Sequence, residues 1–262
     1  MIDDPLRERA RRLWADLAGT PVCFKEAAVE VVVSPQSTLC PPGWVGIVAV
    51  GGAVIATAPD GDAAETVRRA FDDLPTDALI DPAALRDALP VGEVLGPATL
   101  AYCDAAGFRP ADAAMVESIP AGHADLEALL ALVPAEEADE AGLDEITSPV
   151  FVVRSATQVV AAAGYRTWPG NAAHIGVLTA PAQRGRGLAR VVATAAVADA
   201  LRSELLPQWR ARPEASRRVA RALGFRELGY QLSVRLAPVG SIRTVVDRNK
   251  LAERSARNRP TH

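Results

Sequence analysis

The sequence lacks the features that mark several large classes of proteins. Its three cysteines, Cys23, Cys40 and Cys103, are odd in number, far apart and outside any spacing that zinc ligands use. We therefore expect neither a disulfide framework nor a metal site. No apolar run approaches the roughly 20 residues that span a bilayer, and the charged first residues are unlike a secretory signal. These absences predict a cytoplasmic protein without a membrane partner.

The chain as a whole also lacks a net positive charge. The formal net charge is −4, whereas proteins that bind nucleic acid usually present a basic surface to its phosphates. No nucleic-acid partner is therefore expected. Hydrophobic residues make up 49% of the 262 residues and charged residues 23%, so the chain can bury the core of one large domain or two small ones.

Helix-like and strand-like patterns alternate along the chain. In the first half we expect a helix at 7–19, strands at 28–33 and 43–57 with a hairpin turn at Gly51-Gly52, and a helix at 62–74. The second half is expected to contain, in order, a strand at 113–119, a helix at 123–142, strands at 149–154, 159–168 and 173–181, a helix at 188–205, a strand at 206–211, a helix at 213–225 and a strand at 227–236. Residues 241–262 are rich in basic side chains and show no periodicity, so they are expected to be a solvated tail, with partner binding as the alternative.

The two halves share a faint pattern. The sequence IATAP at 55–59 precedes a helix and then AGFR at 106–109, and VLTAP at 177–181 precedes a helix and then LGFR at 223–226. Either a duplication or chance in an alanine-rich chain explains this likeness. The segment after Pro59 is acidic, whereas the segment after Pro181 is basic and contains glycine. If the halves share one architecture, only the second is expected to have an anion site.

The segment AQRGRGLAR at 182–190 joins an expected strand to an expected helix. The first amide N–H groups of a helix have no partner within it, and the helix dipole adds partial positive charge at the same place. Gly185 and Gly187 would let the backbone approach an anion closely, and Arg184, Arg186 and Arg190 would add charge-assisted contacts. This pattern predicts a phosphate or pyrophosphate site, with a solvated basic turn as the alternative.

Motif spacing narrows the choice of ligand. A P-loop would need a lysine followed by serine or threonine, and Arg190 stands where the dinucleotide fingerprint has its third glycine. The spacing that fits is [RQ]-x-x-G-x-[GA], formed by Arg184, Gly187 and Ala189. Here the sequence resembles the GNAT superfamily of acyl-CoA-dependent N-acyltransferases, in which this turn cradles the pyrophosphate of coenzyme A.

The resemblance covers residues 112–237 and includes a second signature, ASRRVARALGF at 215–225. It implies an α+β fold with a mixed, mostly antiparallel central sheet flanked by helices. The implied domains are a GNAT domain at 112–240, an N-terminal α/β domain at 1–111 that is a degenerate copy on the duplication hypothesis, and the tail at 241–262. It also implies that acetyl-CoA, as co-substrate, is contacted by the backbone of Val177, Leu178 and Thr179, by the turn residues Arg184, Gly185, Arg186, Gly187, Leu188, Ala189 and Arg190, and by Ser216.

Two positions depart from the family pattern. Pro213 stands where many members have asparagine, and Ala220 stands where many have a tyrosine that protonates the leaving thiolate. The general acid is therefore open: another group protonates the thiolate, or it leaves unprotonated.

The resemblance implies direct attack of a primary amine on the thioester, which needs a neutral amine and therefore a proton acceptor. His174 is one candidate base, with a structural histidine as the alternative. Glu137 and Glu140 belong to an acidic segment that would border the acceptor site and attract a cationic amine, or would simply form a solvated helix face. Tyr165 and Trp168 would line the acceptor site or belong to the core.

The leading hypothesis is an N-acetyltransferase acting on a small-molecule or protein amine, in which homodimer formation is open. The alternative is a non-catalytic module that binds coenzyme A or a protein partner, for which the missing tyrosine argues. A nucleotide-binding protein is disfavoured by the missing lysine and third glycine.

Overall fold

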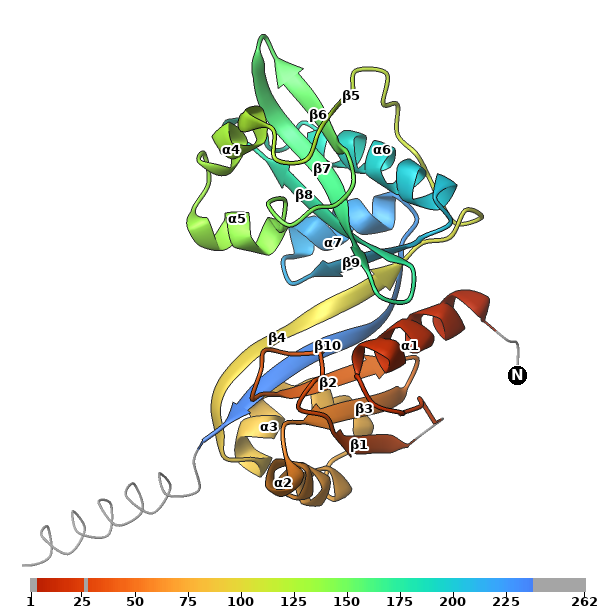
Figure 1. Cartoon of the computed structure of the whole chain (residues 1–262), viewed down its shortest axis with the longest axis vertical. Coiled ribbons are helices and arrows are strands. Elements are labelled where there is room, and N and C mark those ends of the chain that lie inside the picture. The colour runs from red at the N-terminus through yellow and green to blue at the C-terminus, as the bar shows by residue number, and fades with distance from the viewer. Residues whose placement is uncertain (1–3, 26–27, 238–262) are drawn as a thin grey trace, which may run out of the picture.

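The computed structural model describes residues 4–25 and 28–237, so the tail predicted at 241–262 lies outside the described residues. The described strands form one sheet in the order β1-β3-β2-β10-β4-β9-β8-β7-β6-β5 (Figure 1). Neighbouring strands are antiparallel except for β1 with β3 and β8 with β9. Helices pack on both faces, and the predicted α+β class with a mixed, mostly antiparallel sheet is confirmed.

The N-terminal half contains the predicted elements in the predicted order, with further elements at its end. They are α1 (Pro5–Leu17), β1 (Val29–Val33), β2 (Val45–Val50), β3 (Ala53–Ala58), α2 (Gly61–Asp72), the 3-10 helix η1 (Thr76–Ile80), α3 (Pro82–Ala88) and β4 (Val91–Tyr102). The hairpin between β2 and β3 turns at Gly51 and Gly52, whose φ angles of 60° and 82° are those of a turn that glycine favours. Asp4 caps α1 by accepting from the backbone N–H of Arg7.

The C-terminal elements also follow the predicted order. They are β5 (Glu117–Ile119), α4 (Ala124–Leu130), α5 (Ala135–Ala141), β6 (Val150–Ser155), β7 (Gln158–Trp168), β8 (Ala172–Thr179), the 3-10 helix η2 (Pro181–Gln183), α6 (Leu188–Arg202), β9 (Leu206–Ala211), α7 (Glu214–Ala222) and β10 (Arg226–Leu236).

Two predictions about elements are wrong. The single helix expected at 123–142 is two helices, because Pro134 cannot donate a backbone hydrogen bond within a helix and instead stands at the start of α5. Strand β4 was not predicted, because Gly92, Gly96 and Pro97 interrupt its pattern of strand-forming residues.

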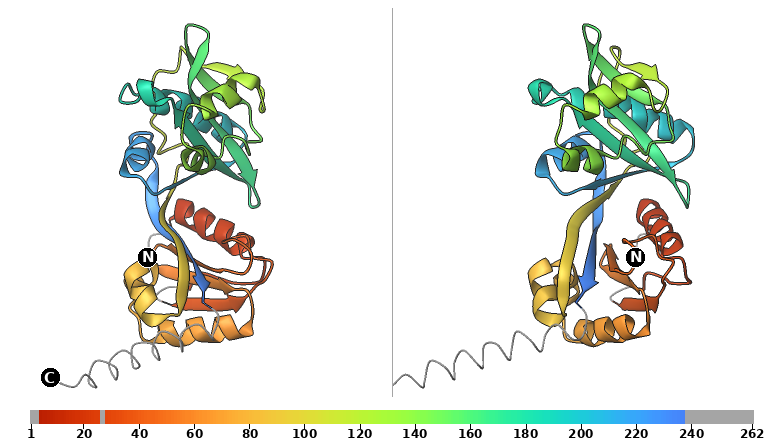
Figure 2. Two further views of the ribbon diagram at one scale, coloured as in Figure 1. Left: turned by 90° about the vertical axis from the view of Figure 1, so that its left-hand side faces the viewer. Right: turned by 60° about the vertical axis from the view of Figure 1, so that its left-hand side comes forward.

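The long strands β4 and β10 join the two halves of the molecule (Figures 1 and 2). Strand β10 pairs with β2 on one side and β4 on the other, and β4 pairs in turn with β9. The register between β10 and β4 shifts at three places, which is how β-bulges bend a ribbon. The predicted domain boundary at 111 and 112 lies between β4 and β5, but the sheet itself continues across both halves.

The duplication hypothesis stays a prediction. Both halves contain an antiparallel hairpin followed by a helix, β2-β3-α2 in one and β7-β8-α6 in the other. In each half the second strand of the hairpin also pairs with a parallel strand, but that strand has a different position in the sequence. In the first half it is β1, which precedes the hairpin, and in the second half it is β9, which follows the hairpin.

The hydrophobic core has three parts. Alternate residues of the N-terminal strands pack on α1 and on α2 with α3, so these helices cover opposite faces, as Figure 2 shows for α1 and α3. The third part lies under α4, α6 and α7 in the C-terminal half. Among the described residues, no helix combines the length and the apolar composition needed to cross a membrane.

Candidate cofactor and acceptor site

Strands β8 and β9 part after a short parallel pairing. They pair at Ala172↔Leu206, Ala173↔Pro207 and His174↔Gln208, and beyond these residues each continues without the other. Residues 175–179 of β8 still pair with β7 on their other side. The edge of β8 that faces the gap therefore offers backbone hydrogen-bonding groups over the stretch that includes Val177, Leu178 and Thr179.

The glycine turn follows directly at the open end of β8. Gly185 and Gly187 have φ angles of 76° and 77°, and a Cβ at either position would meet no atom within 4 Å. The left-handed backbone, rather than crowding, therefore demands glycine here. Gly187 begins α6 without a side-chain cap, and within the described residues no hydrogen bond engages the backbone N–H groups of 185–189. This arrangement of free amides at the N-terminus of a long helix can bind an anion.

Arg184 connects the turn to the acidic helix α5. Its Nε donates to the carbonyl oxygen of Thr179 at 3.2 Å, and its Nη2 forms an ion pair with Glu137. The guanidinium predicted to contact phosphate is thus held by a strand end and a carboxylate.

The other two arginines of the turn make fewer contacts. Arg186 donates to the side-chain oxygen of Gln183, which lies in the same turn. Arg190 reaches the carbonyl oxygen of Arg109 at 3.5 Å, and its Nε is buried without a partner. Both side chains therefore keep N–H groups that no carboxylate of the described chain occupies.

Arginines pair with three carboxylates of the acidic segment. Besides Glu137, Glu140 pairs with Arg212 at 3.1 Å and Glu145 pairs with Arg166. The predicted recruitment of a cationic amine by Glu137 and Glu140 thus loses much of its physical basis, because the arginines offset the field of these carboxylates.

His174 lies where β8 and β9 part, in a row of side chains that crosses four strands. Tyr102 is the register partner of Gln208, Gln208 of His174, and His174 of Arg166. Register partners point to the same face of a sheet, so these side chains are neighbours. The face is the one that α1 covers in the N-terminal half.

The surroundings of His174 keep its imidazole neutral. Nδ1 lies 2.5 Å from Oε1 of Gln208, and the Trp168 ring stacks on the imidazole with 4.3 Å between centroids. Burial lowers the pKa of His174 to about 4, and the positive charges of Arg210 and Arg166 act in the same direction while the Gln208 contact opposes them.

Tyr165 and Trp168 lie on opposite faces of β7. Tyr165 is buried, and its hydroxyl donates to Asp199 of α6 at 2.7 Å. Of the two alternatives stated for Tyr165, the structure thus agrees with a core residue. Trp168 lies beside His174, and the guanidinium carbon of Arg210 is 6.0 Å from its ring centre.

Ser216 lies on α7 beside the other strand of the gap. Its hydroxyl oxygen accepts from the indole N–H of Trp209 in β9 at 3.0 Å. The predicted residues of β8, the turn and α7 thus surround the gap between β8 and β9, and His174 lies where that gap closes.

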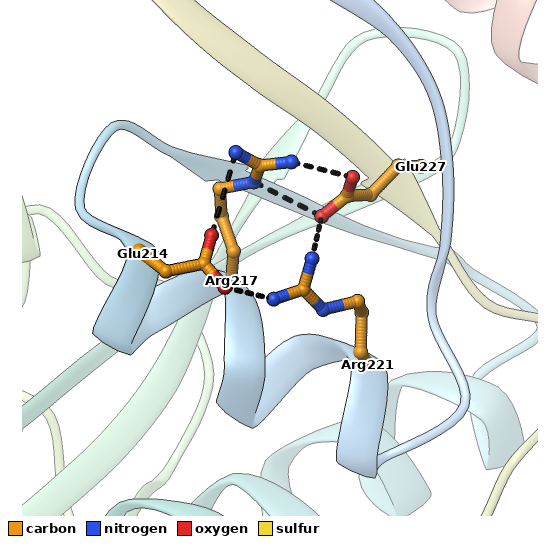
Figure 3. Close-up of polar contacts among 4 residues, drawn as sticks. All are labelled: Glu214, Arg217, Arg221 and Glu227. Atoms are coloured by element: carbon orange, nitrogen blue, oxygen red, sulfur yellow. Dashed lines mark hydrogen bonds and ion pairs between the residues drawn. The ribbon is translucent and has the colours of Figure 1, made fainter.

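An ion network holds α7 against β10 (Figure 3). Arg217 donates to both carboxylate oxygens of Glu227, at 3.0 and 2.7 Å, and Glu214 pairs with Arg217 and Arg221. The hydrogen bonds from Arg217 lower the pKa of Glu227. This network secures the helix that carries Ser216.

Sequence reasoning missed Tyr102, Gln208 and Arg210. Arg210 donates to Oε1 of Gln231 at 3.1 Å. Among the described residues, no carboxylate forms an ion pair with Arg210. The two polar residues at alternate positions of β9, Gln208 and Arg210, were the available signal, but their meaning depends on strand register. Within the described chain, no cluster of three or more histidine, cysteine or acidic residues could hold a metal ion.

Comparison with known proteins finds one family model that matches part of the chain. The family model of GNAT acetyltransferases matches residues 150–231. No curated protein matches the chain. A GNAT-family protein from Novosphingobium aromaticivorans is 22% identical over 55% of this chain, which spans 65% of that protein, with a TM-score of 0.45.

In two other similar solved structures, the match covers nearly the whole of the other protein. A GCN5-related N-acetyltransferase from Kribbella flavida is 15% identical over 89% of this chain and 96% of that one, with a TM-score of 0.49. A Salmonella typhimurium protein described with its cofactor acetyl-CoA is 19% identical over 48% of this chain and 96% of that one, with a TM-score of 0.34. The resemblance seen in the sequence is confirmed by the family model: the chain carries the pattern of the GNAT acetyltransferase family over residues 150–231.

Proposed function

We propose that the protein is an acyl-CoA-dependent N-acyltransferase that transfers the acetyl group of acetyl-CoA to a primary amine. The observation that supports this most is the row of free backbone N–H groups at 185–189, at the start of α6 and beside the gap between β8 and β9. The family match over 150–231 supports the same activity.

The residues present fit coenzyme A. The amides of 185–189, with Arg186 and Arg190, would hold the pyrophosphate, and the backbone of 177–179 would bind the pantetheine arm in the way an adjacent strand does. Arg184 would add its guanidinium to the phosphate site, where the carboxylate of Glu137 competes with phosphate for it and the contact with Thr179 holds the side chain at the turn.

Acetyl-CoA supplies a thioester whose carbonyl carbon is attacked by the neutral amine. The C–N bond forms, the C–S bond breaks, the amine loses one proton and coenzyme A leaves as the thiol or thiolate. This chain's part is to fix both partners at the gap and to exclude competing water.

The charges around His174 favour an acceptor that carries an anionic group. Arg166 and Arg212 are paired with glutamates, His174 is neutral near pH 7, and Arg210 is left without a carboxylate among the described residues. Arg210 is exposed and lies in the field of Arg212, so an anion placed there would offset the repulsion between the two guanidinium groups. We therefore propose an amine with a nearby carboxylate, such as an amino acid or peptide, as the acceptor class.

The test measures thiol release from acetyl-CoA over a panel that pairs each amino acid with its uncharged amide. We expect turnover, with a lower KM for the carboxylate form, and a loss of this preference in Arg210→Gln. Arg202→Gln is the matched control, because Arg202 pairs with Asp199 on α6. Equal KM values would contradict the acceptor class alone.

The alternative of a non-catalytic module is distinguished in the same experiment. It is favoured by Ala220 at the place of the usual tyrosine. Acetyl-CoA binding by calorimetry without turnover on any amine would support a module that binds coenzyme A. Absence of acetyl-CoA binding would contradict that module and the transferase, and would leave only a module that binds a protein partner. Homodimer formation, the cytoplasmic location and the absence of nucleic-acid and membrane partners stay predictions.

A further inference from the structure

A buried polar chain runs from α1 to the place where β8 and β9 part. Its members are Trp14 on α1, Tyr102 on β4, Gln208 on β9 and His174 on β8. The first three side chains are at most 1% exposed, and the last three are register partners in one row. The chain thus connects the N-terminal half to the edge of the candidate site.

The contacts in this chain are continuous except at one atom. The indole nitrogen of Trp14 lies 2.5 Å from the Tyr102 hydroxyl oxygen, and the side chain of Gln208, the register partner of Tyr102, lies beside that hydroxyl. The amide oxygen of Gln208 is placed 2.5 Å from Nδ1 of His174. Its amide nitrogen is buried and has no partner. A buried amide donor without a partner is uncommon and costly in a folded protein.

The direction of the chain is set by Trp14. An indole N–H can only donate, so the Tyr102 oxygen accepts from it and the phenolic proton must point elsewhere. The near acceptor is the amide of Gln208. The oxygen and nitrogen of an amide are assigned from their hydrogen-bond partners, and rotating the Gln208 amide by half a turn puts its oxygen toward Tyr102 and its N–H toward His174. This orientation gives a partner to the phenolic proton and to the orphaned amide nitrogen together.

We propose that Gln208 donates its amide N–H to Nδ1 of His174 and thereby holds His174 as a neutral imidazole with its proton on Nε2. Trp14 and Tyr102 orient Gln208, so all three are positioning residues. Nε2 has no hydrogen-bond partner within the described chain and is not among its buried unpartnered atoms. On this proposal His174 presents an N–H donor instead of the free acceptor that a general base needs, and its role as the base stays a prediction.

The charged groups that face His174 favour the same state. Arg166 on β7 and Arg210 on β9 oppose an imidazolium, and two carboxylates of the acidic segment, Glu140 and Glu145, are paired with Arg212 and Arg166. The role of the Nε2 N–H group rests on the proposed function. In that function it would donate to the thioester oxygen or to the departing sulfur. The tautomer itself is a property of the fold.

The tautomer can be read without substrate by long-range 1H–15N NMR of the full chain labelled at histidine. The three histidines are His123, His174 and His262, and His174→Gln identifies the signal of interest. His123 is an internal reference, because its Nδ1 accepts from the backbone N–H of Asp125 at 3.2 Å. We expect His174 at neutral pH to carry its proton on Nε2. A proton on Nδ1 would overturn the proposal.

Two variants test what fixes the tautomer of His174. In Gln208→Glu the carboxylate can only accept a hydrogen bond, so the proton of His174 should move to Nδ1. The negative charge should also raise the pKa of His174 by more than about one unit. In Trp14→Phe the fixed donor is lost, so both tautomers should appear. Trp44→Phe is the matched control, because the Trp44 ring contacts Arg235, far from this chain.

Each outcome bears on one statement. If Gln208→Glu fails to fold, the wild-type spectrum and Trp14→Phe still decide the tautomer and its origin. An unchanged spectrum in Trp14→Phe would remove Trp14 from the chain of positioning residues. Because no step uses acetyl-CoA or an amine, failure here leaves the proposed transferase activity standing, and an inactive protein leaves the tautomer testable.

Discussion

Gly187 shows how a single residue decides the anion site. Its left-handed backbone excludes most side chains, while the space around it is open. We predict that Gly187→Glu abolishes acetyl-CoA binding in a folded protein, since its carboxylate would occupy the place of a phosphate. Gly187→Asn, which is neutral and tolerates this backbone, should retain most of the affinity. Calorimetry compares the two, and equal affinities would contradict the site.

His174 makes stability depend on pH in a defined window. Its pKa is about 4 in the folded protein and 6.5 as the ordinary value, so between these the unfolded chain binds more protons. Stability should therefore fall as the pH is lowered from 6.5 to 4, by up to about 3 kcal/mol. Denaturant melts at several pH values measure this loss, and His174→Gln should flatten it. The same slope in both proteins would mean that His174 is not held neutral.

Two variants of His174 distinguish a hydrogen-bond donor from a general base. If it acts as a donor, His174→Gln keeps an N–H group and should retain more turnover than His174→Ala, with acetyl-CoA affinity unchanged in both. A general base would instead lose about 10² to 10⁴ in kcat in either variant. Steady-state kinetics with an identified acceptor distinguishes these outcomes.

Helix α5 acts on the glycine turn through one ion pair. Glu137→Gln should release the guanidinium of Arg184, which lies in the same turn as the free amides. Because both partners are about half exposed, stability should change by less than about 1 kcal/mol. Acetyl-CoA affinity should rise several-fold, and the gain should shrink at high salt. Glu136→Gln on the same helix, whose carboxylate pairs with no cation of the described chain, is the control; equal affinities in both variants would contradict the coupling.

Secondary structure was predictable where the pattern is local. The turn at 182–190 and its helix follow from glycine, arginine and apolar spacing within a few residues, and they were predicted. Strand β4 was not, because its glycines and proline weaken the local pattern and its pairing with β9 and β10 stabilises it. The row of Tyr102, Gln208 and His174 was equally hidden, since it exists only once three distant strands are in register.

The whole molecule depends on β4, which lies between β9 and β10 although it precedes the segment that matches the family model. We predict that a chain of residues 113–237 is insoluble, because β9 and β10 lose their shared partner β4 and α1 no longer covers Ala172 and Leu206. A chain that begins at residue 90 keeps β4 and should be more soluble. A soluble 113–237 fragment that binds acetyl-CoA would contradict this dependence.

The central position of β10 also sets the order in which the protein can be completed during synthesis. Leu100 of β4 pairs with Gly229 of β10, which is translated 129 residues later. At the usual speed of a ribosome this delay is roughly 6 to 26 s. Until then the facing edges of β2 and β4 have no strand between them and are open to other chains. A nascent chain that stalls before β10 therefore carries two unsatisfied edges, so it should depend on chaperones for much longer than the family-matched segment alone would indicate.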